Sequence, residues 1–195
     1  MSKKSTDDRK ERIAEIATDI FIEKGYKSTS LQDIAQVAGI TKAGIYHYFK
    51  TKEEILYHIL ATYDINNSIS FQKVRAEIQN PDLDPTSALK MIIRAYARLA
   101  TNKRNINLLG LKERDQLTGE KRESYRKIQQ GIFSRVKKDI AGIRNLKKSL
   151  DLNSIVFMII SMSAWFGYWL KEEGKLTLEE AIEQSIEIIC HGVLE

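Results

Sequence analysis

Apolar residues recur along this chain at the spacing of α-helices, and no alternation typical of strands extends beyond a few residues. The first predicted helix covers residues 7–24 and ends at Gly25, a residue type common at helix C-termini. Its apolar stripe comprises Ile13, Ile16, Ala17, Ile20 and Phe21. Because the chain also contains only two prolines, Pro81 and Pro85, the pattern predicts an all-α fold.

Capping residues then mark two short helices joined by a tight turn. Ser30 and Asp33 can cap the second helix reciprocally, and the apolar residues of this helix fall on one side. Gly39 supplies the turn, and Thr41 caps a third helix that runs to about Phe49. Two helices joined in this way form a helix-turn-helix, whose second helix can enter the roughly 12 Å major groove of DNA.

Longer helices follow these three. Thr51 with Glu54 opens the fourth helix, and the clearest break in the pattern comes at residues 79–84. Asp84 as a cap and Pro85 at the first helical position begin the next helix. The remaining helices are expected at residues 85–101, 103–116, 119–141, 152–172 and 178–193, with Gly174 closing the eighth and Thr177 with Glu180 capping the ninth. The chain is therefore predicted to hold about nine helices, three short ones before a larger bundle.

The region of the third helix differs in charge from its surroundings. The whole chain carries a formal charge of +5, whereas residues 1–60 are nearly neutral, with ten lysines or arginines against nine acidic residues. Between Thr41 and Lys52 there are lysines, including Lys50, but no carboxylate. Free backbone N–H groups at the start of the third and fourth helices also favour phosphate. This local positive surface suits duplex DNA.

The third helix is expected to turn one side to solvent. If Ile45 and Phe49 face the core, the opposite side is free to meet DNA. That side carries two ridges, Lys42 with Tyr46 and Ala43 with His47. Gly44 removes a side chain where the helix must approach DNA closely.

The segment TSLQDIAQVAGITKAGIYHYFKTKEEIL, residues 29–56, resembles the signature of the TetR family of bacterial repressors. The resemblance implies a helix-turn-helix DNA-binding domain over residues 1–52, with the helix-turn-helix itself at about 30–49 and the fourth helix linking onward from residue 52. A ligand-binding and dimerisation domain would then cover residues 53–195. The function implied is that of a homodimeric repressor on a palindromic operator, released from it by a small hydrophobic molecule.

The family's DNA contacts can be carried over onto matching positions of this sequence. Together with Gly44, the expected DNA-contacting residues are Thr29, Ser30, Thr41, Lys42, Ala43, Tyr46, His47, Tyr48 and Lys52. The family often has glycine at the position of Ala43 and histidine at that of Tyr48. These departures leave the base preference open. Lys52 is expected to contact phosphate, and Tyr46 and Tyr48 could instead pack as core aromatics.

A weaker resemblance concerns the effector. The stretches at residues 108–130 and 164–181 are similar to a branch of the family that responds to acyl-CoA thioesters. It implies an apolar tunnel for the acyl chain and basic groups for the CoA phosphates. The candidate ligand residues are Met91, Tyr96, Arg114, Arg122, Arg126, Phe133, Met162 and Trp165. A solvated helix face is the alternative interpretation of the arginines, and the sequence does not identify the effector.

Aromatic residues cluster in the eighth helix. Because residues three and four apart share a helical face, Trp165 groups with Tyr168 and Trp169, and Phe166 points away. Core packing, a self-associating surface and the wall of a ligand cavity all remain open for this cluster. The family resemblance implies a homodimer through the eighth and ninth helices, residues 152–193.

Other classes of protein lack support in the sequence. The three histidines are scattered without partners at metal-ligand spacing, and serine-centred or glycine-rich catalytic motifs are missing. We therefore expect no metal, no cofactor and no enzymatic activity, and we expect Cys190 to lie in the core. The segment 155–170 is shorter than the roughly 20 residues of a membrane span, so a buried helix without membrane contact is expected. With no export signal recognised, the cytoplasm is the expected location.

Two alternative functions stay open. An activator or an architectural DNA-binding protein would share the same motif. A helical ligand carrier or an enzyme, in which the N-terminal helices only pack, would leave the outward Lys42, Tyr46 and His47 without a use.

Overall fold

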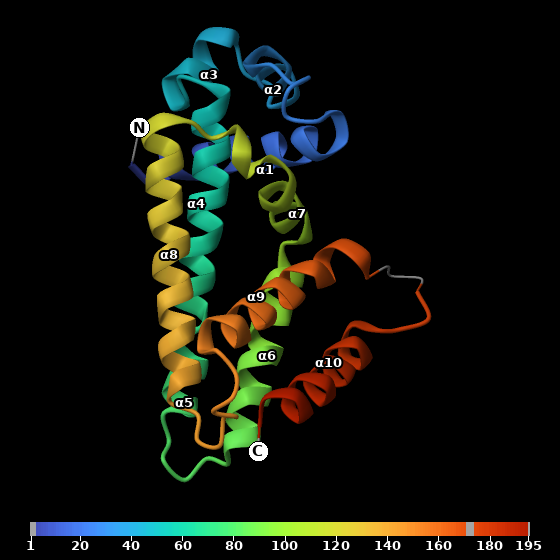
Figure 1. Ribbon diagram of the computed structural model, residues 1–195. Coiled ribbons are helices and arrows are strands. Elements are labelled where there is room, and N and C mark those ends of the chain that lie inside the picture. Colours follow the sequence, from blue (N-terminus) through green and yellow to red (C-terminus); the bar gives the residue numbers. More distant parts are fainter. Residues whose placement is uncertain (1–2, 171–173, 195) are drawn as a thin grey trace. The chain divides into compact units, whose positions relative to one another are not determined.

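The computed structural model describes residues 3–170 and 174–194, with side chains described from residue 7 onward. Regular secondary structure in these residues is entirely helical, apart from one isolated bridge between Leu146 and Leu194 (Figure 1). The α-helices are α1 (Lys3–Lys24), α2 (Leu31–Val37), α3 (Lys42–Tyr48), α4 (Lys52–Ser70), α5 (Gln72–Ile78), α6 (Pro85–Asn102), α7 (Arg104–Glu113), α8 (Gly119–Ala141), α9 (Leu152–Trp169) and α10 (Leu178–Val193), with a short 3₁₀ turn, η1 (Arg114–Gln116), after α7. The predicted all-α fold is confirmed.

The helix starts follow the capping residues that the sequence predicts. Thr177 and Glu180 form a complete capping box at α10, and Asp84 accepts a 2.9 Å hydrogen bond from the backbone N–H of Ser87 at the start of α6. At α4 the backbone N–H of Glu54 donates to the hydroxyl of Thr51 at 3.0 Å. Each cap satisfies N–H groups that have no partner within the helix.

Two helices differ from the prediction. The fourth predicted helix is divided into α4 and α5 at Phe71, although Phe71 keeps helical torsion angles and helical hydrogen bonds on both sides. The eighth was expected to run to about residue 172 and to end at Gly174, but α9 ends at Trp169. There Leu170 adopts extended torsion angles and packs against the hydrophobic core, and residues 171–173 lie outside the described part of the chain.

The chain forms two compact units. The first comprises the described residues up to 65 together with 108–128, and the second comprises 66–107 together with 129–194. Helices α4, α7 and α8 each contribute residues to both units. The domain boundary predicted between residues 52 and 53 stays a prediction.

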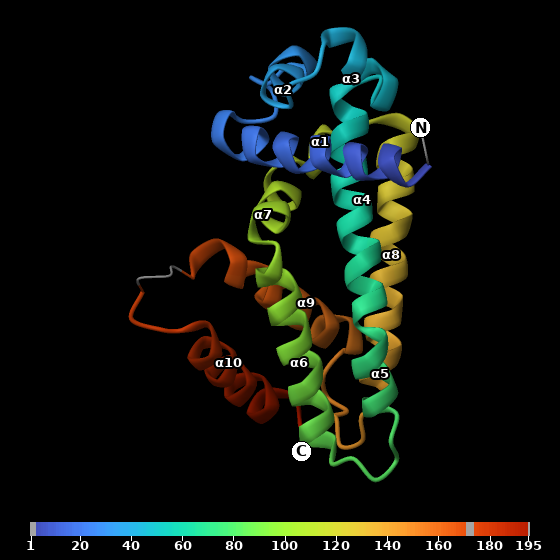
Figure 2. The same cartoon turned by 180° about the vertical axis from the view of Figure 1, so that it is seen from behind.

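In the first unit, α1 lies across the beginning of α4, and α2 and α3 cover the same end (Figures 1 and 2). The side chains that pack here are almost fully buried, including the predicted core positions of α3 and four of the five predicted for α1; the fifth, Ile16, is partly exposed. They are Ile13, Ala17, Phe21, Ile34, Ile45, Phe49, Ile55 and Leu56. Burial of such apolar side chains stabilises the unit by roughly 1.5–3 kcal/mol for each large residue.

In the second unit, α6 packs against α9 on one side and α10 on another (Figure 1). Gly167 allows α9 to approach α7 closely, because a Cβ atom there would lie 2.8 Å from Nδ2 of Asn107. That amide donates to the carbonyl of Ala164 at 2.7 Å, and Nε of Arg104 donates to the carbonyl of Gly167 at 2.7 Å. Polar anchors therefore fix the start of α7 against the end of α9.

Helix α9 is amphipathic rather than fully buried. Phe166 and Val156 lie in the core, whereas Phe157 and Met158 are more than half exposed. By length and composition alone α9 could cross a membrane, with a mean hydropathy of 1.3, but core helices of globular proteins meet the same criterion. The expectation of a buried helix holds for one face of α9 only.

Candidate nucleic-acid interface

Helix α2 begins with the predicted reciprocal cap. The hydroxyl of Ser30 accepts from the backbone N–H of Asp33 at 3.2 Å, and the Asp33 carboxylate accepts from the backbone N–H of Ser30 at 2.7 Å. The Ser30 hydroxyl also donates to the Asp33 carboxylate at 2.7 Å, and this bond, together with that from the Ser30 backbone N–H, holds the pKa of Asp33 below its ordinary value because both favour the ionised form. The cap fixes where α2 starts and leaves Ser30 at the surface.

The turn between α2 and α3 depends on Gly39. Its φ of +66° lies in the left-handed region that other residues adopt at a cost. The backbone N–H of Ile40 donates across the turn to the carbonyl of Ala35 at 3.0 Å, which closes the C-terminus of α2. The sequence-based assignment of this glycine to the turn is confirmed.

Helix α3 is oriented by two core residues. Ile45 and Phe49 are both 0% exposed, so the opposite side of the helix must face solvent. The hydroxyl of Thr41 caps the helix by accepting from the backbone N–H of Gly44 at 3.0 Å. The residues of the two predicted outward ridges, Lys42, Ala43, Tyr46 and His47, are all exposed. We call these four residues the reading face.

The charge around the reading face is positive. Lys42 has no hydrogen bond or ion pair within the described residues, and its ammonium is available to a ligand. Nζ of Lys50 donates to the carbonyl of Tyr46 at 2.6 Å, which places a second ammonium at the C-terminal end of α3. The carboxylate of Glu54 accepts from the backbone N–H of Lys50 at 2.7 Å and so belongs to the α4 cap.

Two predicted contact residues of α3 also have local structural roles. A Cβ atom on Gly44 would lie 3.2 Å from the capping hydroxyl of Thr41, so glycine here relieves crowding within the helix itself. Tyr48 is half-buried and its ring meets the edge of His47, with 5.1 Å between the centroids. Tyr48 therefore lies at the margin of the reading face rather than within it.

Thr29 does not belong to the exposed surface, although the resemblance implied a DNA contact. It is 3% exposed, and its hydroxyl donates to the carbonyl of Gly25 at 2.8 Å. The hydroxyl thereby closes the loop after α1, where Gly25 has a φ of +83°. The hydroxyl, N–H and carbonyl of Thr29 thus all have partners within the described residues, and Ser30 is the exposed residue of the pair.

Lys52 was expected to contact phosphate, but the structure gives its ammonium other partners. Nζ donates to the carbonyls of Tyr26 at 2.6 Å, Thr29 at 2.7 Å and Lys27 at 3.3 Å. It also lies 4.3 Å from the centroid of the Tyr26 ring. Burial lowers the pKa of Lys52, with the nearby Glu113 acting in the opposite direction. Because an ammonium has three N–H donors, these carbonyls occupy all of them.

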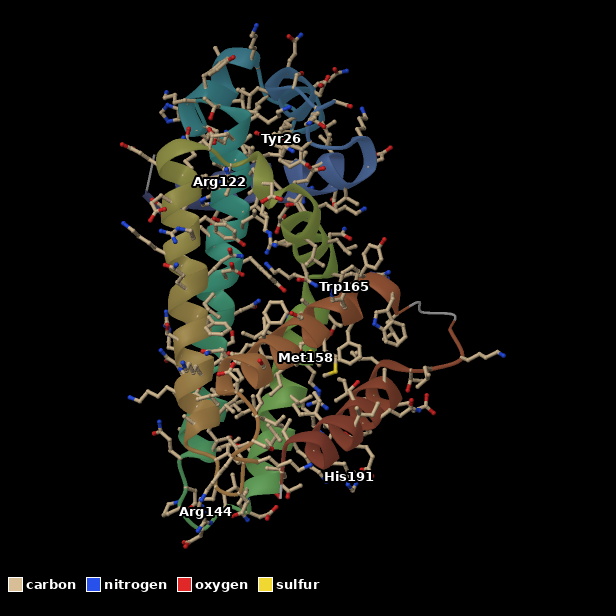
Figure 3. The ribbon with its side chains drawn as sticks, in the orientation of Figure 1. Tyr26, Arg122, Arg144, Met158, Trp165 and His191 are labelled. Atoms are coloured by element: carbon tan, nitrogen blue, oxygen red, sulfur yellow. The ribbon has the colours of Figure 1, made fainter. Side chains whose placement is uncertain are left out.

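The candidate ligand residues are divided between the two units, and their role in ligand binding stays a prediction. Arg114, Arg122 and Arg126 belong to the first unit, where Arg126 pairs with Glu123 at 2.9 Å and Arg122 lies 3.9 Å from Asp115 (Arg122 is labelled in Figure 3). Arg122, Asp115 and Arg126 are exposed and Glu123 is partly exposed, as expected of a solvated helix face. The other candidates, Met91, Tyr96, Phe133, Met162 and Trp165, belong to the second unit.

A groove of about 770 Å³ runs along α6 in the second unit. Met91, Ala95 and Leu99 form part of its apolar lining, and Met91 is the one candidate ligand residue that lines it. Tyr96 instead packs against Phe71, with 4.6 Å between the ring centroids. Sequence reasoning did not single out the rest of the groove, because its lining combines residues of the consecutive helices α4, α5 and α6 with residues of α10, which lies about 80 positions further along the chain.

One face of α9 is rich in exposed apolar side chains, α10 adds Ile188, and Figure 3 labels Met158 and Trp165 along α9. The exposed residues are Phe157, Met158, Trp165, Tyr168, Trp169 and Ile188, with exposed fractions between 47% and 73%. Trp165, Tyr168 and Trp169 share this face, and Phe166 is 1% exposed, as the helical spacing predicts. Cys190 is buried in the core, also as predicted, and burial raises the pKa of its thiol.

Comparison with known families gives two matches. Residues 13–59 match the family described as bacterial regulatory proteins, tetR family. Residues 82–193 match the family described as the tetracyclin repressor-like C-terminal domain. The first match contains the helix-turn-helix, and the second covers more than half of the chain.

The chain is also similar to individual proteins and to solved structures. The HTH-type transcriptional repressor KstR2 of Rhodococcus jostii (strain RHA1) is 24% identical over 197 residues, which cover 95% of this chain and 91% of that protein. The transcriptional regulator YhgD of Bacillus subtilis (strain 168) is 44% identical over 55 residues, which cover 28% of this chain and 29% of that protein. The crystal structure of AibR with isovaleryl coenzyme A and operator DNA has a TM-score of 0.76 at 26% identity, over 92% of this chain and 97% of that one.

Proposed function

This chain belongs to the TetR family of bacterial regulatory proteins, and from this premise we propose that it represses transcription as a homodimer on a palindromic operator. At the family level it is a helix-turn-helix transcription regulator. Its named relatives are regulators of transcription rather than enzymes. Its site of action is then the bacterial cytoplasm, where the chromosome lies.

The observation that carries this proposal is the reading face. A single helix turns Lys42, Tyr46 and His47 to solvent, while its other side is anchored by core residues. A rigid helix with a basic, hydrogen-bonding face and no carboxylate can enter the major groove. A protein whose N-terminal helices only pack would gain nothing from such a face.

The exposed face of α9 and α10 supports the dimer. Soluble monomers rarely expose several large apolar side chains side by side, and such patches commonly mark interfaces. A two-fold axis through this face would bring the same residues of two copies together. The dimer would then offer two reading faces to successive major grooves about 34 Å apart, which requires a palindromic or nearly palindromic site.

For the effector we propose a small hydrophobic molecule of the acyl-CoA class. The structural relative AibR forms a complex with isovaleryl coenzyme A and operator DNA. A ligand that binds the DNA-free conformation more tightly lowers operator affinity by the same factor by which DNA lowers ligand affinity. Burial at about 0.8 kcal/mol per methylene predicts about a fourfold gain in affinity for each added methylene, until the site is full.

A reporter gene under a selected operator tests the sign of regulation. We expect the protein to lower reporter output and acyl-CoAs to release a labelled operator in vitro, with longer chains acting at lower concentration. Higher output in the presence of the protein would instead identify an activator. If no acyl-CoA up to about 100 µM releases the operator, the effector belongs to another chemical class, and the DNA-binding function is unaffected.

A further inference from the structure

The loop between α1 and α2 turns its carbonyl oxygens inward. Gly25 begins the loop with a left-handed backbone, and the backbone N–H of Thr29 donates to the carbonyl of Tyr26 at 3.3 Å. The carbonyls of Tyr26, Lys27 and Thr29 thus converge on the Lys52 ammonium. Tyr26, labelled in Figure 3, is buried beside that ammonium. Lys52 therefore ties the first residue of α4 to the loop that precedes the helix-turn-helix.

The next residue of α4 holds a different segment. Oε1 of Glu53 accepts from the backbone N–H of Thr118 at 2.6 Å and from its hydroxyl at 2.9 Å. Oε2 of Glu53 lies 3.8 Å from Nζ of Lys121 in the first turn of α8. A carboxylate at a helix N-terminus interacts favourably with the free N–H groups there. Glu53 therefore ties α4 to the start of α8.

We propose that Lys52 and Glu53 form a two-sided clamp, through which the first turn of α4 couples the start of α8 to the α1–α2 loop and so positions the reading face. Successive residues of a helix point about 100° apart, which lets neighbouring side chains hold two different segments. Helix α8 contributes residues 119–128 to the first unit and continues into the second. A displacement of the start of α8 is then passed to the loop through α4.

In this clamp Lys52 and Glu53 are positioning residues. The inference rests on the proposed function only where it says that the clamp positions the reading face. Direct phosphate binding by Lys52 is the competing role. The two roles differ in salt dependence, because removing one phosphate-binding cation reduces the slope of log affinity against log salt by about 0.9. Lys52→Met is expected to weaken operator binding without changing this slope. A slope reduced by about one for each protomer would overturn the positioning role.

Hydrogen exchange of the DNA-free protein tests the coupling itself. Glu53→Ala removes the interactions with Thr118 and Lys121 but touches nothing in the α1–α2 loop. The clamp predicts exchange about tenfold faster at the amides of Gly25 and Thr29, because charge-assisted hydrogen bonds of this kind hold the far side of α4 in place. Exchange that changes only around residues 117–122 would overturn the coupling.

Two further variants provide an alternative perturbation and a matched control. Thr118→Val leaves α4 unaltered and removes only the hydroxyl donor, so a smaller acceleration of exchange at Gly25 and Thr29 is expected. If Glu53→Ala does not fold, this variant tests the coupling in its place. Glu120→Gln is the matched control, since Glu120 sits in the same first turn of α8 and is exposed. It should leave Gly25 and Thr29 unchanged. Because no DNA is present, a negative result refutes the clamp and leaves the proposed function standing.

Discussion

Lys42→Ala tests whether the reading face meets DNA. Lys42 is the first residue of α3, it is exposed, and it has no partner within the described residues. Its removal should therefore leave the fold intact and delete one cation at the interface. In the proposed dimer two such cations are removed, which reduces the slope of log affinity against log salt by about 1.8. At 0.1 M salt the same factor corresponds to a loss of up to about 60-fold in affinity.

Fluorescence anisotropy of a labelled operator duplex, measured between 50 and about 200 mM salt, gives both quantities. Lys148→Ala is the control, because Lys148 is an exposed lysine of the second unit that carries no part of the proposed interface. Its slope should equal that of the wild type. A Lys42→Ala slope equal to the wild-type slope would refute the assignment of α3 as the DNA-contacting helix.

Three other outcomes are expected. Met158→Glu places a charge on the exposed face of α9 and should shift the protein from dimer to monomer in sedimentation at micromolar concentration. Met158→Leu should leave the dimer intact. A monomeric wild-type protein would contradict the dimer. In Gly39→Ala the new Cβ meets no atom within 4 Å, but the residue must adopt a φ of +66°, so thermal denaturation should show a free energy of unfolding lower by about 1 kcal/mol. Gly192→Ala should leave the free energy of unfolding unchanged. Burial raises the pKa of Asp64 to about 6, and its hydrogen bond with Tyr125 acts in the opposite direction. The protonated carboxyl therefore stabilises the folded state fully below about pH 4, and this contribution to the free energy of unfolding is lost as pH rises through 6. Asp64→Asn should accordingly be more stable than the wild type at pH 7, by up to about 3 kcal/mol, and an unchanged pH dependence of unfolding would contradict this.

Local sequence rules predicted the helix-turn-helix closely. The caps at Ser30 and Thr41 and the turn at Gly39 depend on interactions within a few residues, which a sequence pattern contains. The same holds for the side of α3 that carries Ile45 and Phe49. These elements could be written down before any tertiary contact was known.

Contacts between distant segments could not be predicted in this way. Lys52 was expected to contact phosphate, and nothing in the local sequence shows that the carbonyls of a loop more than twenty residues earlier surround its ammonium. Thr29 was likewise expected at the DNA-contacting surface from the family resemblance, yet its burial depends on how α1 and α2 pack. Glu53 had no recognisable role, because its partner Thr118 lies 65 positions away. For the candidate ligand residues, helical spacing predicts which side chains share a face but not which faces enclose a cavity.

Selection of bound duplexes from a random pool tests whether this protein recognises operator DNA through α3. We expect enrichment of a palindromic site whose half-sites are centred about one helical turn apart, and loss of that enrichment when Tyr46 and His47 are both replaced by alanine. Replacement of Lys148 and Ser149 by alanine, two exposed residues of the second unit outside α9 and α10, should retain the enriched site. Enrichment of no sequence, or of the same sequence by the Tyr46→Ala, His47→Ala protein, would contradict the claim that this chain reads operator DNA through α3.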